Sequence, residues 1–161
     1  MTPLQEALEW AKAGVKLVEE SFQRPDDDFA YVVLVLGPGT QRLVLPLDPE
    51  FFGSRAGQER LAKEHLPGLI RQYKPLAMAI VCPAWELDPK LMGAPLELIE
   101  RAHGQDAVMI CVASAQGYLF EIAMVTRHDH AAASVGKWET PGGTPGNVAE
   151  AMVRAFRELA A

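Results

Sequence analysis

The sequence predicts a single α+β domain, residues 1–161, in which helices cover a mainly antiparallel sheet of five strands. Five stretches repeat apolar residues at every second position, and two pairs of these stretches are joined by short turns that contain glycine. Helical spacing recurs at both ends of the chain and once between the two hairpins. The predicted order is helix, two strands, helix, three strands, helix, which favours α+β over repeated βαβ units.

A helix is predicted at the N-terminus. Thr2 is a suitable N-cap, Pro3 suits the first helical position, and Gln5 can complete a capping box. The apolar face of this helix is wide enough to pack on a sheet. It comprises Leu4, Leu8, Ala11, Val15, Val18 and Phe22. Residues 23–28, which include Pro25 and three aspartates, are expected to end the helix.

A β-hairpin is predicted over residues 29–47. Its strands, 29–36 and 41–47, flank a Gly-Pro-Gly-Thr turn at residues 37–40, whose glycines supply the positive φ angles that tight hairpins need. Pro46 removes one backbone donor from the second strand. That strand is therefore expected at an edge of the sheet.

A second helical region is predicted over residues 54–73, with Ser54 as its cap. Because a proline inside a helix removes a backbone hydrogen bond and costs about 3 kcal/mol, Pro67 predicts a kink or two short helices. Residues 76–85 then form the third strand. Pro83, near the end of that strand, indicates a bulge or an exposed edge.

A second hairpin is predicted from residues 106–114 and 118–127, around a turn at 115–117. Within its second strand, Glu121 and Arg127 fall on the face opposite to a row of apolar and aromatic residues. That row comprises Tyr118, Phe120, Ile122 and Met124.

The remaining segments give weaker signals. Residues 88–104 are expected to form a loop, although Pro95 can open a short helix. Residues 128–146 are rich in glycine, proline and small side chains, and they are predicted to be a flexible segment. Asn147 followed by Glu150 is a suitable cap pair for a final helix.

The two cysteines predict a structural role. Cys82 and Cys111 each lie within a strand-like apolar run, where a reduced thiol behaves as a small hydrophobic group. A zinc site would need further ligands that their spacing does not supply, and a domain of this size does not need a disulfide. A bridge between neighbouring strands is left open.

Charge and composition limit the classes of partner. The net charge is −6, and the resulting negative field repels phosphate backbones and anionic membranes. We therefore expect no nucleic acid and no membrane partner. The first residues show neither a charged region nor an apolar run typical of a signal peptide, so a cytoplasmic location is expected. No cofactor motif is present in the sequence, and no cofactor is expected.

The densest group of metal-capable side chains is His128-Asp129-His130. Alternate residues of an extended chain share a face, so His128 and His130 can reach one ion. A catalytic zinc needs about three protein ligands, and no third one is marked by spacing, so a solvated strand end is the competing interpretation. Glu121 and Glu86 can form an acid and base pair if their strands are adjacent, although exposed sheet carboxylates are commoner than catalytic ones.

Other polar residues have simpler explanations. His65 lies on the apolar side of a helix, where a hydrogen-bonded core imidazole is expected, and His103 is expected in an exposed loop. The three aspartates 26–28 lack the spacing of a calcium loop and suit a turn. Residues 141–147 lack the lysine of a phosphate-binding loop and are interpreted as a linker.

Two tryptophans are candidates for an interface. Trp85 and Trp138 lie near predicted strand ends, where large amphipathic rings often anchor contacts with a partner. Packing within the chain's own core is the alternative for each of them.

The strand that closes on Cys82-Pro83-Ala84-Trp85 resembles one found in a group of uncharacterised small bacterial and phage proteins. In that group the corresponding strand tends to close on Ser-Glu-Ala-Trp, after a hairpin and a helix. The resemblance covers about residues 29–139 and implies the strand order, but it implies no activity. Pro83 stands where the group carries glutamate, so no role of that acid is transferred to this chain.

These observations lead to three functional hypotheses. The first is a non-enzymatic protein-binding or self-assembling module that uses a sheet edge or a helix face, with a protein partner or a second copy. The second is a small acidic chaperone of the secretion type. The third, from another class, is a metal-dependent or acid-base hydrolase that uses His128, His130 and Glu121.

Overall fold

The computed structural model describes residues 1–83, 106–140 and 147–161. Its helical elements are α1 (Pro3–Ser21), η1 (Pro49–Phe52), α2 (Arg55–Arg60), η2 (Leu61–His65), α3 (Leu66–Tyr73) and α5 (Asn147–Ala160). Its strands are β1 (Val32–Leu36), β2 (Arg42–Pro46), β3 (Ala77–Pro83), β4 (Ala107–Ser114), β5 (Gly117–Thr126) and β6 (Ser134–Val135). The class is α+β, as predicted.

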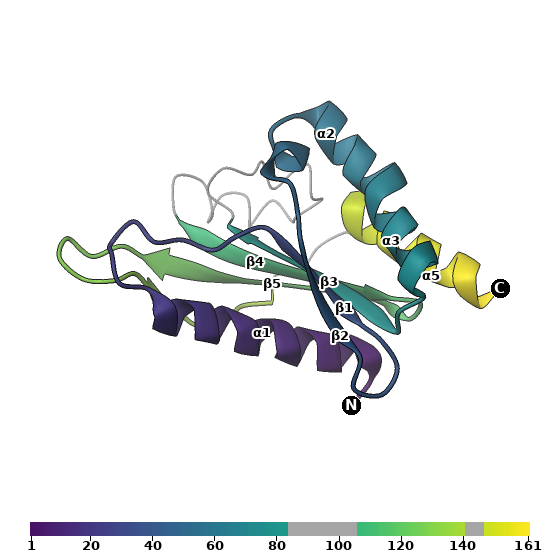
Figure 1. Ribbon diagram of the computed structural model, residues 1–161, viewed down its shortest axis with the longest axis horizontal. Helices are drawn as coiled ribbons and strands as arrows, with labels where there is room; N and C mark the ends of the chain where they lie inside the picture. Colours follow the sequence, from purple (N-terminus) through teal and green to yellow (C-terminus); the bar gives the residue numbers. More distant parts are fainter. Residues whose placement is uncertain (84–105, 141–146) are drawn as a thin grey trace.

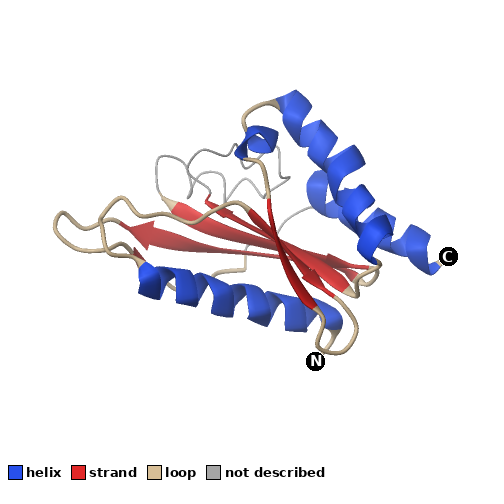
Figure 2. Cartoon of the chain, in the orientation of Figure 1, coloured by secondary structure: helices blue, strands red, loops and turns tan. Residues whose placement is uncertain are grey.

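The strands form one antiparallel sheet between two helical layers. The strand order is β2-β1-β3-β4-β5-β6, so β2 and β6 lie at opposite edges. Figure 1 shows α1 along one face of the sheet, with α2, α3 and α5 over the other face. The same three layers are visible when helices and strands are coloured separately (Figure 2). Because β1, β3 and β4 lie between both layers, their side chains are almost all buried.

The face under α1 is closed by an amphipathic helix. Thr2 caps α1 and exchanges hydrogen bonds with Gln5, so the predicted capping box is confirmed. The buried residues of α1 recur at helical spacing and pack on alternate residues of β1, β3, β4 and β5. They are Ala7, Leu8, Ala11 and Val15.

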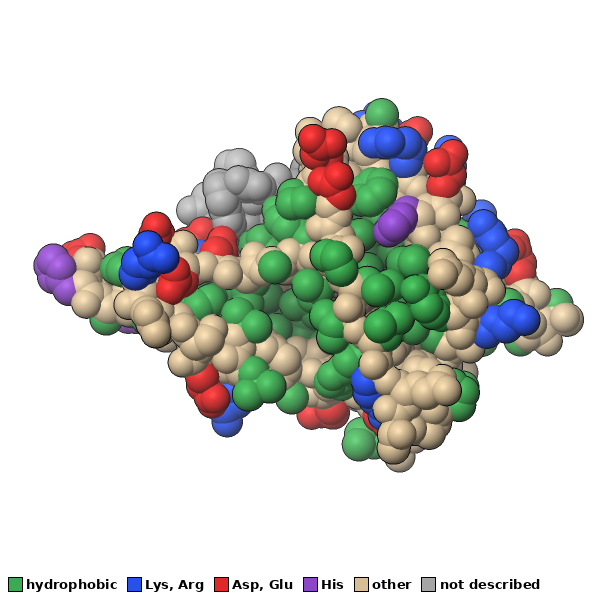
Figure 3. Space-filling view, viewed as in Figure 1, with side chains coloured by type: hydrophobic (Ala, Val, Ile, Leu, Met, Phe, Trp, Pro, Cys, Tyr) green, Lys and Arg blue, Asp and Glu red, His purple; other side chains and the backbone are tan. Residues whose placement is uncertain are grey.

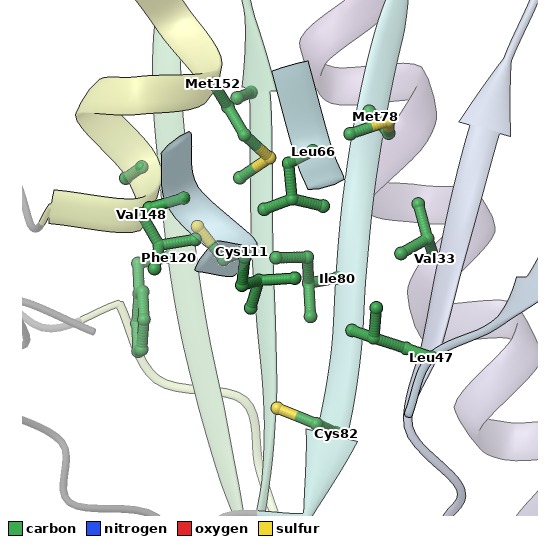
Figure 4. Close-up of a cluster of buried hydrophobic side chains, with 14 of the residues drawn as sticks. Val33, Leu47, Leu66, Met78, Ile80, Cys82, Cys111, Phe120, Val148 and Met152 are labelled. Atoms are coloured by element: carbon green, nitrogen blue, oxygen red, sulfur yellow. The ribbon is translucent and has the colours of Figure 1, made fainter. Parts of the chain in front are cut away.

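The opposite face of the sheet holds the larger core. Figure 4 shows its side chains converging from the strands and from the helices above them. Members with less than 2 % exposure include Leu66, Ile80, Met109 and Met152. Each fully buried aliphatic side chain of this kind contributes about 1.5–3 kcal/mol relative to exposure.

The predicted hairpin turns and the predicted helix distortion are both present. Gly39 has a φ of +64°, a backbone angle that residues other than glycine rarely adopt. Between α2 and α3 the Leu66 N–H donates to the Leu61 carbonyl, five residues back, and this widens η2 into a π-helical turn. Pro67 follows directly and has no N–H to continue the regular ladder, so the wide turn accommodates it.

The number and order of strands differ from the prediction. The sheet has six strands and not five, because β6 adds a short strand between β5 and α5. β6 lies inside the range 128–146, which composition predicts as flexible. Its pairing joins Val125 to Val135 and Thr126 to Ser134. Two residues are too few for hydrophobic periodicity to reveal, so the sequence carries no signal for this strand.

Candidate functional site

The free edge of β2 is the candidate functional site, and its hydrogen-bond pattern can be followed from the two ends of the hairpin. The Leu47 N–H donates to the Tyr31 carbonyl at 2.9 Å, and the Gly37 N–H donates to the Gln41 carbonyl at 3.0 Å. Hydrogen-bonded and non-hydrogen-bonded pairs alternate along an antiparallel ladder. These two bonds therefore fix which residues of β2 face β1.

By this alternation, Leu43 and Leu45 direct their backbone groups toward β1. Arg42, Val44 and Pro46 direct theirs away from the sheet. β2 ends the strand order, and no other described strand pairs with its outer side. The outer side of β2 thus offers two N–H groups, from Arg42 and Val44, and three carbonyl groups.

The side chains of this edge are apolar and exposed on both faces of the sheet. Val44 lies on the α1 face beside Leu34 and is 56 % exposed, whereas Leu43 lies on the opposite face beside Val35 and is 37 % exposed. Figure 3 shows hydrophobic side chains gathered in the middle of this side of the molecule, over β2 and between the two helical layers. The middle of β2 therefore presents both unpaired backbone groups and apolar side chains.

The features that usually prevent an edge strand from pairing with another strand are found only at the two ends of β2. Natural edges are commonly protected by charged side chains and by proline. Here the Arg42 guanidinium turns onto α1, where it lies 2.6 Å from a Glu6 carboxylate oxygen and 5.7 Å from the centre of the Trp10 ring. Pro46 lacks its N–H on the outer side, as the sequence predicts for an edge strand. Val44, between them, has neither protection.

The helical layers extend the apolar surface on each side. On α1, Leu17 lies two turns beyond Trp10 on the same stripe of the helix and is 68 % exposed. On the other layer, the Phe51 ring lies 4.9 Å from the ring of His65, which is half-buried. His65 thus packs against an aromatic ring at the border of the core.

A buried ion pair lies at the far side of the sheet. The Lys12 ammonium on α1 is 3.0 Å from a Glu121 carboxylate oxygen on β5, and the Glu121 side chain is 8 % exposed. The same ammonium lies 6.0 Å from the centre of the Trp138 ring. Glu121 is on the face predicted from the sequence, but its partner is a helix lysine. Trp138, one of the two predicted interface residues, makes these contacts within its own chain.

The two histidines proposed as metal ligands lie in an exposed part of the chain. The His128 Nε2 atom is 3.1 Å from the Ser134 hydroxyl, and His130 is exposed. Among residues 1–83, 106–140 and 147–161, no group of three or more histidine, cysteine or acidic side chains is placed to hold a metal ion. The described residues therefore add no third ligand to His128 and His130.

Two of the three aspartates at residues 26–28 contact Arg127 of the same chain, Asp28 through its carboxylate and Asp27 through its backbone carbonyl. Arg127 donates to Asp106 at 2.9 Å, lies 3.1 Å from Asp28, and also donates to the backbone carbonyls of Pro25 and Asp27. Partial burial opposes its charge, but the bonds to Asp106 and Asp28 outweigh this and raise the pKa of Arg127. This arginine fastens the loop after α1 to the end of β5.

Both cysteines are buried as thiols, as predicted. Cys82 and Cys111 lie on neighbouring strands, in diagonal positions of the larger core (Figure 4). Burial raises the pKa of the Cys82 thiol far above its ordinary value, with the nearby Cys111 adding to the effect. Burial likewise raises the pKa of Cys111 to about 12. Neither thiol is available as a thiolate near neutral pH.

A shallow hollow of about 580 Å³ lies between α5 and the start of β5. Arg154 and Arg157 line it together with Glu150 and Glu158, so the lining selects neither anions nor cations. Tyr118 stands at the same place. Partial burial raises the pKa of its phenol, with smaller effects from neighbouring groups.

Several candidates from the sequence lie outside the described residues. They are Trp85, Glu86, His103 and residues 141–146. The Cys-Pro-Ala-Trp motif continues beyond Pro83 into the same region, so its comparison with other proteins stays a prediction.

Comparisons with known proteins give no relatives. No protein-family model, no curated protein and no solved structure matches this chain. In the part of the chain that the structure describes, no helix has both the length and the apolar character needed to cross a membrane.

Proposed function

We propose that this protein is a non-enzymatic protein-binding or self-assembling module that engages its partner through the free edge of β2. The observation that supports this proposal most directly concerns Val44, in the middle of the edge. Its N–H and carbonyl point outward, and its side chain is 56 % exposed. Strands that offer unpaired backbone groups pair readily with another strand.

The chemistry of the edge supports an extended, apolar partner strand. Main-chain hydrogen bonds would supply affinity, and the exposed side chains of Leu43 and Val44 would contact apolar residues on either face of the added strand. Leu17 of α1 widens the surface on one side. A partner of this kind fits the expected class, a protein, and does not require a cofactor.

A photocrosslinking experiment tests this function. A photo-reactive phenylalanine analogue is placed at position 44, and a control protein carries it at Glu9, on the exposed side of α1. The proposal expects a protein adduct from position 44 in cells and none from position 9. Absence of any adduct from position 44, in a protein that folds normally, would contradict the proposal. An adduct with an unfolded client would instead indicate the chaperone activity.

A further inference from the structure

We infer that the partner strand is β2 of a second copy of this chain, added antiparallel so that Val44 lies opposite Val44 of the second copy. This inference rests on the proposed function, because it names the occupant of the same edge. It joins the two sheets into one continuous sheet about a twofold axis at Val44, which is the closed symmetry most common among soluble oligomers.

The backbone groups of the edge satisfy this pairing. The two Val44 residues would exchange two hydrogen bonds, one in each direction. Each Arg42 N–H would then donate to the Pro46 carbonyl of the other copy. The missing N–H of Pro46 leaves only the Arg42 carbonyl without a strand partner, and that carbonyl stays accessible to water at the end of the ladder.

Neighbouring registers are less favourable. A register centred on Leu45 would place Pro46 opposite Val44 on both sides, and each of these pairs would form one bond. Between residues 42 and 46 that register makes two bonds, whereas the register centred on Val44 makes four. A register centred on Leu43 would keep the bonds but would bring the two Arg42 residues into diagonal positions, about 7–8 Å apart. Glu6 compensates part of this charge, but the same register would also place Leu45 opposite the polar Gln41 of the second copy. The register centred on Val44 therefore remains.

The side chains of β2 are self-complementary in this register. On the α3 face, Leu43 would lie opposite Leu45 of the second copy, and on the α1 face the two valines would meet. Charges at the two ends of β2 also match. Arg42, which is paired with Glu6 of its own chain, begins the strand, and Asp48 follows its end as the cap of η1. Antiparallel pairing therefore brings each Arg42 to the same end of the ladder as Asp48 of the other copy. An edge with these matching ends favours a second copy over an unrelated strand.

Cysteine crosslinking tests both the partner and the register. The Val44→Cys chain is oxidised under mild conditions, with Leu43→Cys as the matched control. Opposite residues of a hydrogen-bonded pair have Cα atoms about 5.5 Å apart, inside the range of about 4.4–6.8 Å that disulfides span. The two Leu43 positions would be diagonal, at about 7–8 Å, and outside that range. Cys82 and Cys111 do not compete, because both are buried with raised pKa values.

The expected result is a disulfide-linked species of twice the 17.6 kDa chain from Val44→Cys and little or none from Leu43→Cys. Light scattering of the unmodified protein provides a second readout, because it should show the same doubled mass. Val44→Lys should raise the dimer dissociation constant about tenfold or more, since two like charges would face each other, whereas Val44→Thr should leave it nearly unchanged.

Four results would overturn this inference. A single-chain mass at all concentrations, with no crosslink from position 44, excludes the second copy. Stronger crosslinking from Leu43→Cys than from Val44→Cys excludes the register. A photo-adduct from position 44 that contains a different protein also excludes the second copy, but it leaves the proposed function intact. Absence of every adduct removes both proposals.

Discussion

The β5 side of the sheet is covered by residues 134–139, the covering segment, which lie between β5 and α5, whereas no strand of the described residues pairs with the outer side of β2. At the covered side, β6 pairs with the end of β5, and Glu139 exchanges backbone hydrogen bonds with Ile122. The Glu19 carboxylate on α1 accepts a hydrogen bond from the Val135 N–H and holds β6 in place. Of the described residues, none covers the outer side of β2 in this way.

Both sides nevertheless use the same kind of charged contact to fasten α1. At the covered side Lys12 pairs with Glu121 and faces the Trp138 ring, and at the open side Arg42 pairs with Glu6 and faces Trp10. The difference is burial, since the carboxylate side chain is 8 % exposed at Glu121 and 42 % exposed at Glu6. The comparison shows that this chain covers one edge of its sheet with its own backbone, and that the described residues place no strand on the other edge.

The largest expected effect is on the covered ion pair. Lys12→Ala leaves the buried Glu121 carboxylate without its partner and should lower the free energy of unfolding by about 2–3 kcal/mol. Arg42→Ala, which breaks the exposed pair, should cost less than about 1 kcal/mol. Urea unfolding of both variants measures the difference. Equal losses would show that burial does not distinguish the two sides.

A double variant sharpens this result. Lys12→Met combined with Glu121→Leu removes both charges and should regain most of the lost stability, because no buried charge remains unpaired. Failure to regain it would indicate that Lys12 acts through packing of its side chain and not through the ion pair.

The next effect concerns the covering segment. Trp138→Ala removes a ring that packs against α1 and should cost about 1–3 kcal/mol. The Gly136 and Glu139 amides, which donate to the Met124 and Ile122 carbonyls, should then exchange with solvent faster. Hydrogen exchange read residue by residue checks this. Unchanged protection of both amides would mean that Trp138 does not hold the segment.

A smaller effect is expected for stability at the open edge. Val44→Lys should change the free energy of unfolding of the single chain by less than about 0.5 kcal/mol, because the side chain is exposed. Association should weaken about tenfold or more in the same variant. Urea denaturation at low protein concentration measures the stability of the single chain, and light scattering at high protein concentration measures association. A large loss of stability would show that Val44 serves the fold instead of a partner.

The smallest effect is a pH dependence at the loop after α1. The backbone N–H groups of Gln23 and Arg24 donate to the Asp27 carboxylate and lower its pKa below the ordinary value of 3.8. The carboxylate therefore adds stability above about pH 4, and this contribution disappears as the pH falls through the lowered pKa. Asp27→Asn should lower Tm slightly at pH 7, and the difference should shrink as the pH falls below the ordinary carboxyl value of 3.8. A difference that stays constant with pH would exclude this charge effect.

Sequence periodicity predicts most of the sheet because its central strands are long and continuously apolar. β3 and β4 are buried along their whole length, and Pro46 correctly places β2 at an edge. The same signal is wrong for Pro83, which is buried in the central strand β3 and pairs with Val108 of β4 without a bulge. β6 escapes prediction because its position depends on a contact with Glu19, which lies far away in the sequence. Non-local contacts of this kind leave no local pattern.

The candidate site is only partly readable from the sequence. The sequence predicts a sheet edge or a helix face as the interaction surface. The direction of each backbone group follows from the register with β1, which the sequence does not encode locally. Trp138 is a case in which the sequence points to a residue but not to its contacts. Its size and place predict an interface, and this stays a prediction. Its contact with Lys12 of the same chain could not be read from the sequence, because it depends on how the fold places α1.

Amide exchange at β2 tests the central claim most directly. The Leu43 and Leu45 amides donate within the β1–β2 ladder and should be protected at every protein concentration. The outward Val44 and Arg42 amides should exchange rapidly when the protein is dilute and become protected as concentration rises and the edge pairs. Val44 and Arg42 amides that exchange rapidly at every concentration, and with every bound protein, would contradict the account.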